Sequence, residues 1–114
     1  MKEFIFNEYG KCINPNRIPV GNKEFYAEIV TACKDGKWYH GFWYWTRGHS
    51  FDMDAYLNTA SCDTEREAIM KESEYLASSL SDDVERSRCE VPLSVFNELR
   101  DIYNKYRNPQ MSLF

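Results

Sequence analysis

The clearest pattern along the chain is a pair of ten-residue segments whose alternate positions form two different sets, one uncharged and one that mixes aromatic and charged side chains. FYAEIVTACK and KWYHGFWYWT occupy residues 25–34 and 37–46 and are rich in β-branched and aromatic residues. Such runs are typical of β-strands. Asp35-Gly36, between them, supplies the two positive φ angles of a type I′ turn, whose twist matches that of paired strands. The pattern therefore predicts a β-hairpin over residues 25–46.

The two faces of this hairpin differ in character. The turn places Ile29 opposite Phe42 and Ala27 opposite Tyr44 on a face without charge, which we predict to be the core face. The other face carries Glu28 within a group of four aromatic side chains: Tyr26, Tyr39, Trp43 and Trp45.

Other extended segments are shorter. Phe4–Phe6 and Ile18–Val20 are separated by Asn14-Pro15-Asn16, which is typical of a turn. After the hairpin, apolar and polar residues alternate over Met53–Thr59, which predicts a third strand.

Two helices are predicted in the second half of the chain. Thr64 and Glu67 form a capping box, so a helix begins there, and we expect it to end before Ser81-Asp82-Asp83. Pro92 suits the first turn of a final helix, which Asn108-Pro109 ends. Together these elements predict a single α+β domain over residues 1–114. In it, a three-stranded antiparallel sheet (β-β-β-α-α) has two C-terminal helices packed on one face.

Cysteine usage and the N-terminus bear on the compartment. The N-terminus is acidic, no apolar run has the length of a signal peptide, and no stretch has the length of a membrane span. We therefore expect a cytoplasmic protein with free thiols and no membrane association, with a secreted two-disulfide protein as the alternative. The cysteines, which form no CxxC motif, are Cys12, Cys33, Cys62 and Cys89.

Charge is distributed unevenly along the chain. The net charge is −4, and residues 51–90 carry 11 Asp or Glu against 4 Lys or Arg, whereas residues 1–50 carry 5 against 7. An acidic chain is a poor candidate for nonspecific DNA binding, which depends on neutralising phosphates. Glu65 and Glu72 of the acidic first helix could face a basic partner, or could simply be solvated.

Residues that could carry chemistry are few. The chain contains no P-loop, no GxSxG, no GxGxxG and no HExxH motif. His49, Asp52 and Asp54 could ligate a metal, but solvated loop residues have the same composition. Cys33 and His40 share a hairpin face and could form a dyad, although buried cysteine is commonly an apolar filler. We predict no catalytic residues, no metal and no cofactor.

The aromatic hairpin face has several interpretations. If exposed, it would bind a protein or stack nucleic-acid bases. Alternatively, the N-terminal segment covers it, or a second copy of the chain covers it in a homodimer.

The run DGKWYHGFWYW followed by TEREAIMKESEYL resembles small proteins encoded on bacterial phages and mobile elements. The resemblance covers roughly residues 25–76 and includes no catalytic motif. It implies an accessory protein that binds a host protein such as a defence protein. We therefore predict a non-enzymatic protein-binding domain, an anti-defence inhibitor or regulator, with nucleic-acid binding as the alternative and a small metal-dependent enzyme third. The predicted contact residues are Tyr26, Tyr39, Trp43, Trp45, Glu65 and Glu72.

Overall fold

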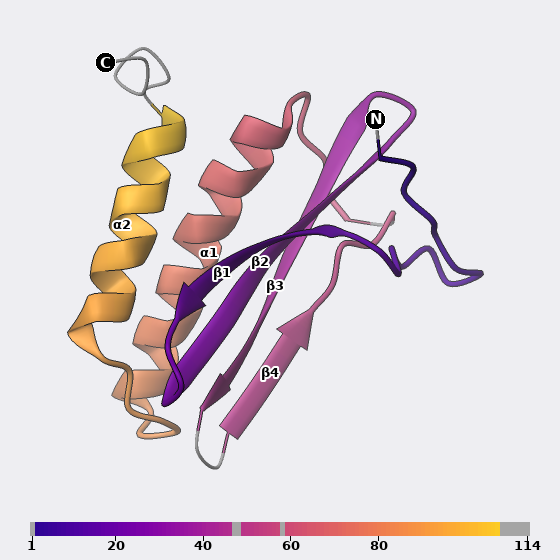
Figure 1. The fold of residues 1–114 in the computed structure, drawn as a ribbon. Helices are drawn as coiled ribbons and strands as arrows, with labels where there is room; N and C mark the ends of the chain where they lie inside the picture. Colours follow the sequence, from indigo (N-terminus) through magenta and orange to yellow (C-terminus); the bar gives the residue numbers. More distant parts are fainter. Residues whose placement is uncertain (1, 47–48, 58, 108–114) are drawn as a thin grey trace.

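The computed structural model describes residues 2–46, 49–57 and 59–107, although in residues 49–53 only the side chain of Ser50 is described. The described chain forms an antiparallel sheet followed by two helices that cover one of its faces (Figure 1), which confirms the predicted α+β class. The sheet has the order β1-β2-β3-β4. Its elements are β1 (Asn16–Gly21), β2 (Phe25–Lys34), β3 (Lys37–Thr46), β4 (His49–Met53), α1 (Glu65–Glu85) and α2 (Leu93–Arg107).

The hairpin of β2 and β3 has the register that the sequence predicts. Ile29 lies opposite Phe42 and Cys33 opposite Trp38. The turn residues Asp35 and Gly36 have φ angles of 53° and 77°. Both values lie in the left-handed region that a type I′ turn requires.

Two strands differ from the expectation. β1 contains the extended segment predicted at residues 18–20 and pairs along β2, so the sheet has one strand more than the three predicted. β4 occupies residues 49–53 and ends where the predicted strand 53–59 begins. β4 lies at the edge of the sheet (Figure 1) and pairs only with β3. An edge strand needs no continuous apolar face, so a polar segment that is typical of a loop can form one.

Helix α1 begins as predicted and extends further than predicted. The side-chain oxygen of Thr64 accepts a hydrogen bond from the amide of Glu67 at 3.1 Å. The helix then continues through residues 81–83 to Glu85. The reason is Asp83, which is buried against the sheet and accepts a hydrogen bond from the hydroxyl of Tyr44. Tertiary contact therefore overrides the weak helix propensity of this segment.

The main core lies between the helices and the uncharged face of the hairpin. Phe42 and Tyr44 stack at a centroid distance of 6.5 Å, and Phe25 stacks on Tyr44 at 5.6 Å. This confirms the assignment of the core face. The buried members of this core are Val20, Phe25, Ala27, Ile29, Phe42, Tyr44, Leu76, Leu80, Val95 and Leu99.

Two further observations bear on the expectations about thiols and membranes. The four cysteines, all of which lie in the described part of the chain, are free. Within the described ranges, neither α1 nor α2 is long and apolar enough to cross a bilayer.

Candidate protein-binding face

The sheet face that points away from the helices, here called the outer face, is divided into a covered and an uncovered half. Near the hairpin turn, Val30 and Ala32 are buried in a second apolar cluster with Cys12 and Ala55. This half is covered by the N-terminal segment, which lies on the side of the sheet opposite the helices in Figure 1. The partly buried side chains that pack against the cluster are Phe4, Phe6, Tyr39 and Trp43.

The N-terminal segment is held in place by its own hydrogen bonds. The side chain of Asn14 accepts a bond from the amide of Ile5 at 2.7 Å and donates one to the carbonyl of Glu3 at 2.9 Å. The amide of Cys12 donates to the carbonyl of Ala55 at 3.0 Å, which ties the segment to the chain beyond β4. The covered half of the outer face is therefore a second core.

The uncovered half contains Trp45 at its far end. Trp45 is 48% exposed, and it lies opposite Tyr26 in the register of β2 and β3. The neighbouring Trp43 is partly buried, and its ring meets that of Tyr26 edge-on at a centroid distance of 5.3 Å. Aromatic side chains thus lie side by side across two strands, as the alternation along the hairpin predicts.

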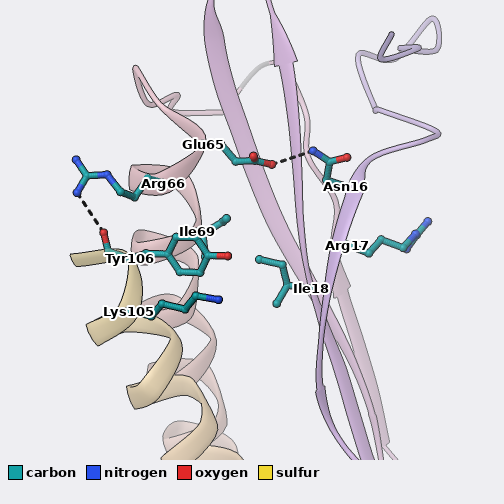
Figure 2. Close-up of a pocket in the computed structure, with 8 residues that line it drawn as sticks. All are labelled: Asn16, Arg17, Ile18, Glu65, Arg66, Ile69, Lys105 and Tyr106. Atoms are coloured by element: carbon teal, nitrogen blue, oxygen red, sulfur yellow. Dashed lines mark hydrogen bonds between the residues drawn. The ribbon is translucent and has the colours of Figure 1, made fainter. Parts of the chain in front are cut away.

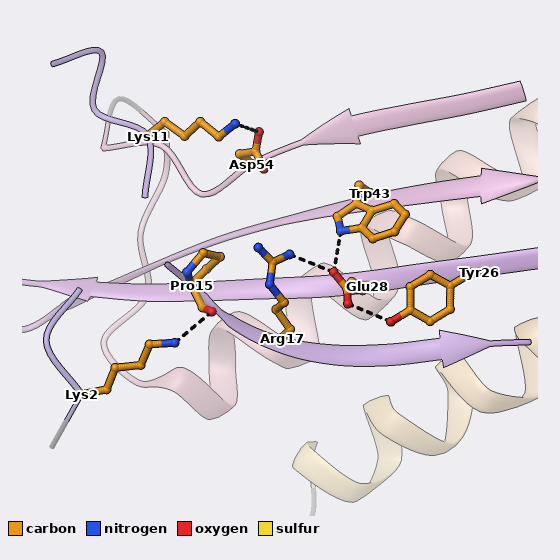
Figure 3. A network of polar contacts seen from close by, with 8 residues as sticks. All are labelled: Lys2, Lys11, Pro15, Arg17, Tyr26, Glu28, Trp43 and Asp54. Atoms are coloured by element: carbon orange, nitrogen blue, oxygen red, sulfur yellow. Dashed lines mark hydrogen bonds and ion pairs between the residues drawn. The ribbon is translucent and has the colours of Figure 1, made fainter. Parts of the chain in front are cut away.

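Glu28 organises these aromatic residues, as Figure 3 shows. One carboxylate oxygen accepts hydrogen bonds from Nε1 of Trp43 at 2.6 Å and from Nη1 of Arg17 at 2.9 Å. The other accepts a bond from the hydroxyl of Tyr26 at 2.8 Å. We call these four residues the Glu28 network. It fixes the Trp43 and Tyr26 rings and the guanidinium of Arg17 relative to one another.

The network shifts the ionisation of its members. Burial raises the pKa of Glu28, but the hydrogen bonds from Tyr26, Arg17 and Trp43 favour the carboxylate more strongly, so the pKa lies below its ordinary value of 4.5. The hydrogen bond to Glu28, together with burial, raises the pKa of Tyr26 above 10.0. Glu28 is therefore ionised, and Tyr26 is a neutral donor, at neutral pH.

A hollow of about 410 Å³ adjoins the network on the outer face. It is bordered by Trp43 and Trp45 and by three charged residues that take part in two ion pairs. Lys11 pairs with Asp54 at 3.0 Å, and Arg17 pairs with Glu28 at 2.9 Å (Figure 3). The residues around the hollow are Lys11, Arg17, Trp43, Tyr44, Trp45, Ser50 and Asp54.

The predicted acidic surface of α1 is corrected by the structure. Glu72 is buried, and a hydrogen bond of 2.7 Å joins its carboxylate to Nδ1 of His40 on the sheet. Glu65 is partly buried and accepts bonds from Asn16 and Thr31, each at 2.8 Å. Both carboxylates therefore point at the sheet, and Glu72 is not available to a partner.

The spacing of these acids carried a signal that the sequence interpretation missed. Glu65 and Glu72 are seven residues apart, and Glu72 lies three residues after Ile69 and four before Leu76. Those spacings place Glu72 on the buried apolar stripe of the helix.

A second hollow, of about 530 Å³, lies between β1 and the two helices (Figure 2). Ile18 and Ile69 form apolar walls, and the Tyr106 side chain reaches in from α2. Figure 2 shows the guanidinium groups of Arg17 and Arg66 directed away from the hollow. Because these two cationic groups point away from it, the second hollow is the weaker candidate for binding a partner.

Among the residues considered for metal or nucleophilic chemistry, those whose side chains are described do not converge. Among the described side chains, no three His, Cys, Asp or Glu residues are placed to hold a metal ion. Asp54 pairs with Lys11, and the side chains of His49 and Asp52 lie outside the described part. His40, considered with Cys33 as a dyad, is hydrogen-bonded to Glu72 instead.

Of the six predicted contact residues, the four aromatic ones share the outer face, with Trp45 the most open and Tyr39 packed against the covered cluster. Arg17 and Lys11, which the sequence interpretation did not single out, join them at the first hollow. Comparisons of the chain with protein-family models, with curated proteins and with solved structures find no match.

Proposed function

We propose that this protein is a small non-enzymatic binding domain that occupies the surface of a partner protein through the uncovered half of its outer face. The observation that supports this most directly is Trp45, which is 48% exposed on a strand paired on both sides. Tryptophan, tyrosine and arginine are the residues most enriched among binding anchors. Trp45, Trp43, Tyr26 and Arg17 bring all three kinds together.

Rigidity supports the same proposal. Trp43, Tyr26 and Arg17 are held by the Glu28 network before any partner arrives. Side chains that are already ordered lose little conformational entropy on binding, so more of the contact energy appears as affinity. Trp45 lies opposite Tyr26 on the neighbouring strand, so strand pairing fixes its backbone as it does that of Tyr26.

Nucleic-acid binding is the second candidate, because bases stack on exposed aromatic rings beside cationic side chains. Against it, both cations at the hollow are paired with carboxylates of the same chain. A nucleic-acid strand binds by having many phosphates neutralised, whereas Lys11 and Arg17 are the two cations among the described residues at this hollow, and the whole chain carries a net charge of −4. The outer face therefore suits a protein better than a polyphosphate backbone.

The nature of the partner is proposed from the sequence resemblance. Residues 25–76 resemble proteins of phages and mobile elements, and this supports a cytoplasmic host protein, such as a defence protein, as the target. The protein would then act as an inhibitor or regulator by covering a surface that its target needs.

Site-specific photocrosslinking in the native cell tests the proposal. A photoreactive amino acid at Ser50, which is exposed at the hollow, should give a discrete protein adduct. Trp45→Ala should abolish that adduct because it removes the exposed anchor. Leu93→Ala, at an exposed apolar residue at the start of α2, is the matched control and should leave it unchanged.

The identity of the adduct separates the alternatives. A nuclease-sensitive adduct supports the nucleic-acid alternative, and an adduct with two copies of this chain supports a homodimer. An adduct that persists in the Trp45→Ala variant contradicts the proposed binding face.

A further inference from the structure

We infer that the partner presents an acidic segment to the outer face and that Arg17 is the residue that recognises it. This inference rests on the proposed function, since it names the chemistry of the partner at the same surface. It is carried by the arrangement of charges around the hollow and by the hydrogen-bonding capacity of Arg17.

In both ion pairs near the hollow, the side chain of the cation is more exposed to solvent than that of the carboxylate. The Arg17 side chain is 48% exposed, whereas the Glu28 side chain is 13% exposed. Lys11 is 38% exposed and Asp54 is 22% exposed. The two pairs are neutral by count, but an approaching molecule meets the positive groups first. A complementary partner surface is therefore negative.

Arg17 has donors to spare for such a partner. A guanidinium carries five N–H donors in a planar fork, and the bond from Arg17 to Glu28 uses only Nη1. Glu28 binds one nitrogen of the fork (Figure 3). The exposed edge can then bind a carboxylate with two parallel hydrogen bonds, the geometry that makes arginine selective for carboxylates.

The position of Trp45 adds a second requirement for the segment. Arg17 lies opposite Val30 on β1, and Trp45 lies opposite Tyr26 on β3, yet both border one hollow. From strand spacing and rise, their backbones are about 16 Å apart, the span of about five extended residues. The fitting segment has a carboxylate and an apolar or aromatic side chain separated by about four residues.

Defined peptides test the inference without knowledge of the natural partner. The acidic probe is a fluorescein-labelled peptide of about twelve residues with one Phe and a Glu cluster about four residues away, and in the neutral probe Gln replaces every Glu. Fluorescence anisotropy should show about tenfold tighter binding of the acidic probe at about 20 mM salt, with the preference shrinking at about 150 mM.

Substitutions assign the preference to Arg17. Arg17→Gln should remove it, while Arg100→Gln, at an exposed arginine on α2, should keep it. Trp45→Ala should weaken both probes by the same factor and leave their ratio unchanged. Thermal unfolding of each variant verifies that the fold is retained.

Equal affinity for the two probes overturns the inference, as does the absence of measurable binding of either probe. Tighter binding of a single-stranded oligonucleotide of about twelve nucleotides overturns it in favour of nucleic acid. If the Ser50 adduct still depends on Trp45 while the acidic preference is missing, the proposed function stands and only the acidic partner is wrong.

Discussion

Replacing Trp43 with phenylalanine keeps a ring on the outer face and removes one donor from Glu28. Nε1 of Trp43 donates to that carboxylate at 2.6 Å, and Arg17 and Tyr26 donate at 2.9 Å and 2.8 Å. A hydrogen bond to a charged group contributes about 1.5–3 kcal/mol to stability. Because Glu28 keeps two donors, we expect Trp43→Phe to lower the free energy of unfolding by about 1.5 kcal/mol, at the lower end of that range.

Urea unfolding followed by far-ultraviolet circular dichroism measures this change without using tryptophan fluorescence. In a separate thermal unfolding experiment, the melting temperature of Trp43→Phe should lie about 6 °C below that of the wild type, as expected for a domain of this size. Trp45→Phe is the matched control on the same strand. Since Trp45 is 48% exposed, its free energy of unfolding should change by less than about 0.5 kcal/mol.

A double-mutant cycle with Glu28→Gln attributes the cost to the hydrogen bond, and we expect a coupling energy of about 1 kcal/mol. The pH dependence gives a second readout. The folded-state pKa of Glu28 lies below 4.5, so its contribution is present above that value and is lost as the pH falls through the lowered pKa. Wild type should therefore lose more stability than Glu28→Gln between about pH 5 and pH 3. Equal costs for the two tryptophans, or a coupling energy of zero, would refute the reasoning.

Three further outcomes follow from the same structure. Phe42→Ala, in the buried core, should lower the free energy of unfolding by about 3–5 kcal/mol, and a loss below about 1 kcal/mol would contradict its packing. Tyr44→Phe leaves the buried carboxylate of Asp83 without its tyrosine donor and should cost about 2 kcal/mol in thermal unfolding, and a neutral effect would argue against that hydrogen bond. Thiol titration of the denatured protein without reductant should find four reactive groups, and finding two would show a disulfide.

The parts of the fold that the sequence predicted are those specified by neighbouring residues. Asp35-Gly36 determines the hairpin because few residues adopt its two positive φ angles, and the register of the whole hairpin follows from that turn. Thr64 and Glu67 mark the start of α1 for a similarly local reason.

The parts that were missed depend on distant contacts. The end of α1 is set by Asp83, whose carboxylate meets Tyr44 on a strand about forty residues earlier in the chain. Glu72 is buried because His40 lies opposite it on the sheet. An acidic residue with a sheet partner looks like a solvated one when only its own helix is considered, so the acidic surface was overestimated.

The outer face shows the same limit at the candidate site. Alternation along a strand identifies which residues share a face but does not identify what covers it, so Ala32 and Trp45 look equivalent in the sequence. The N-terminal segment makes the difference by covering Ala32 and leaving Trp45 open. Trp43 belongs to both halves, because it packs against the covered cluster and donates to Glu28. A substitution at Trp43 therefore changes stability and binding together, whereas a substitution at Trp45, which is 48% exposed, can separate the two.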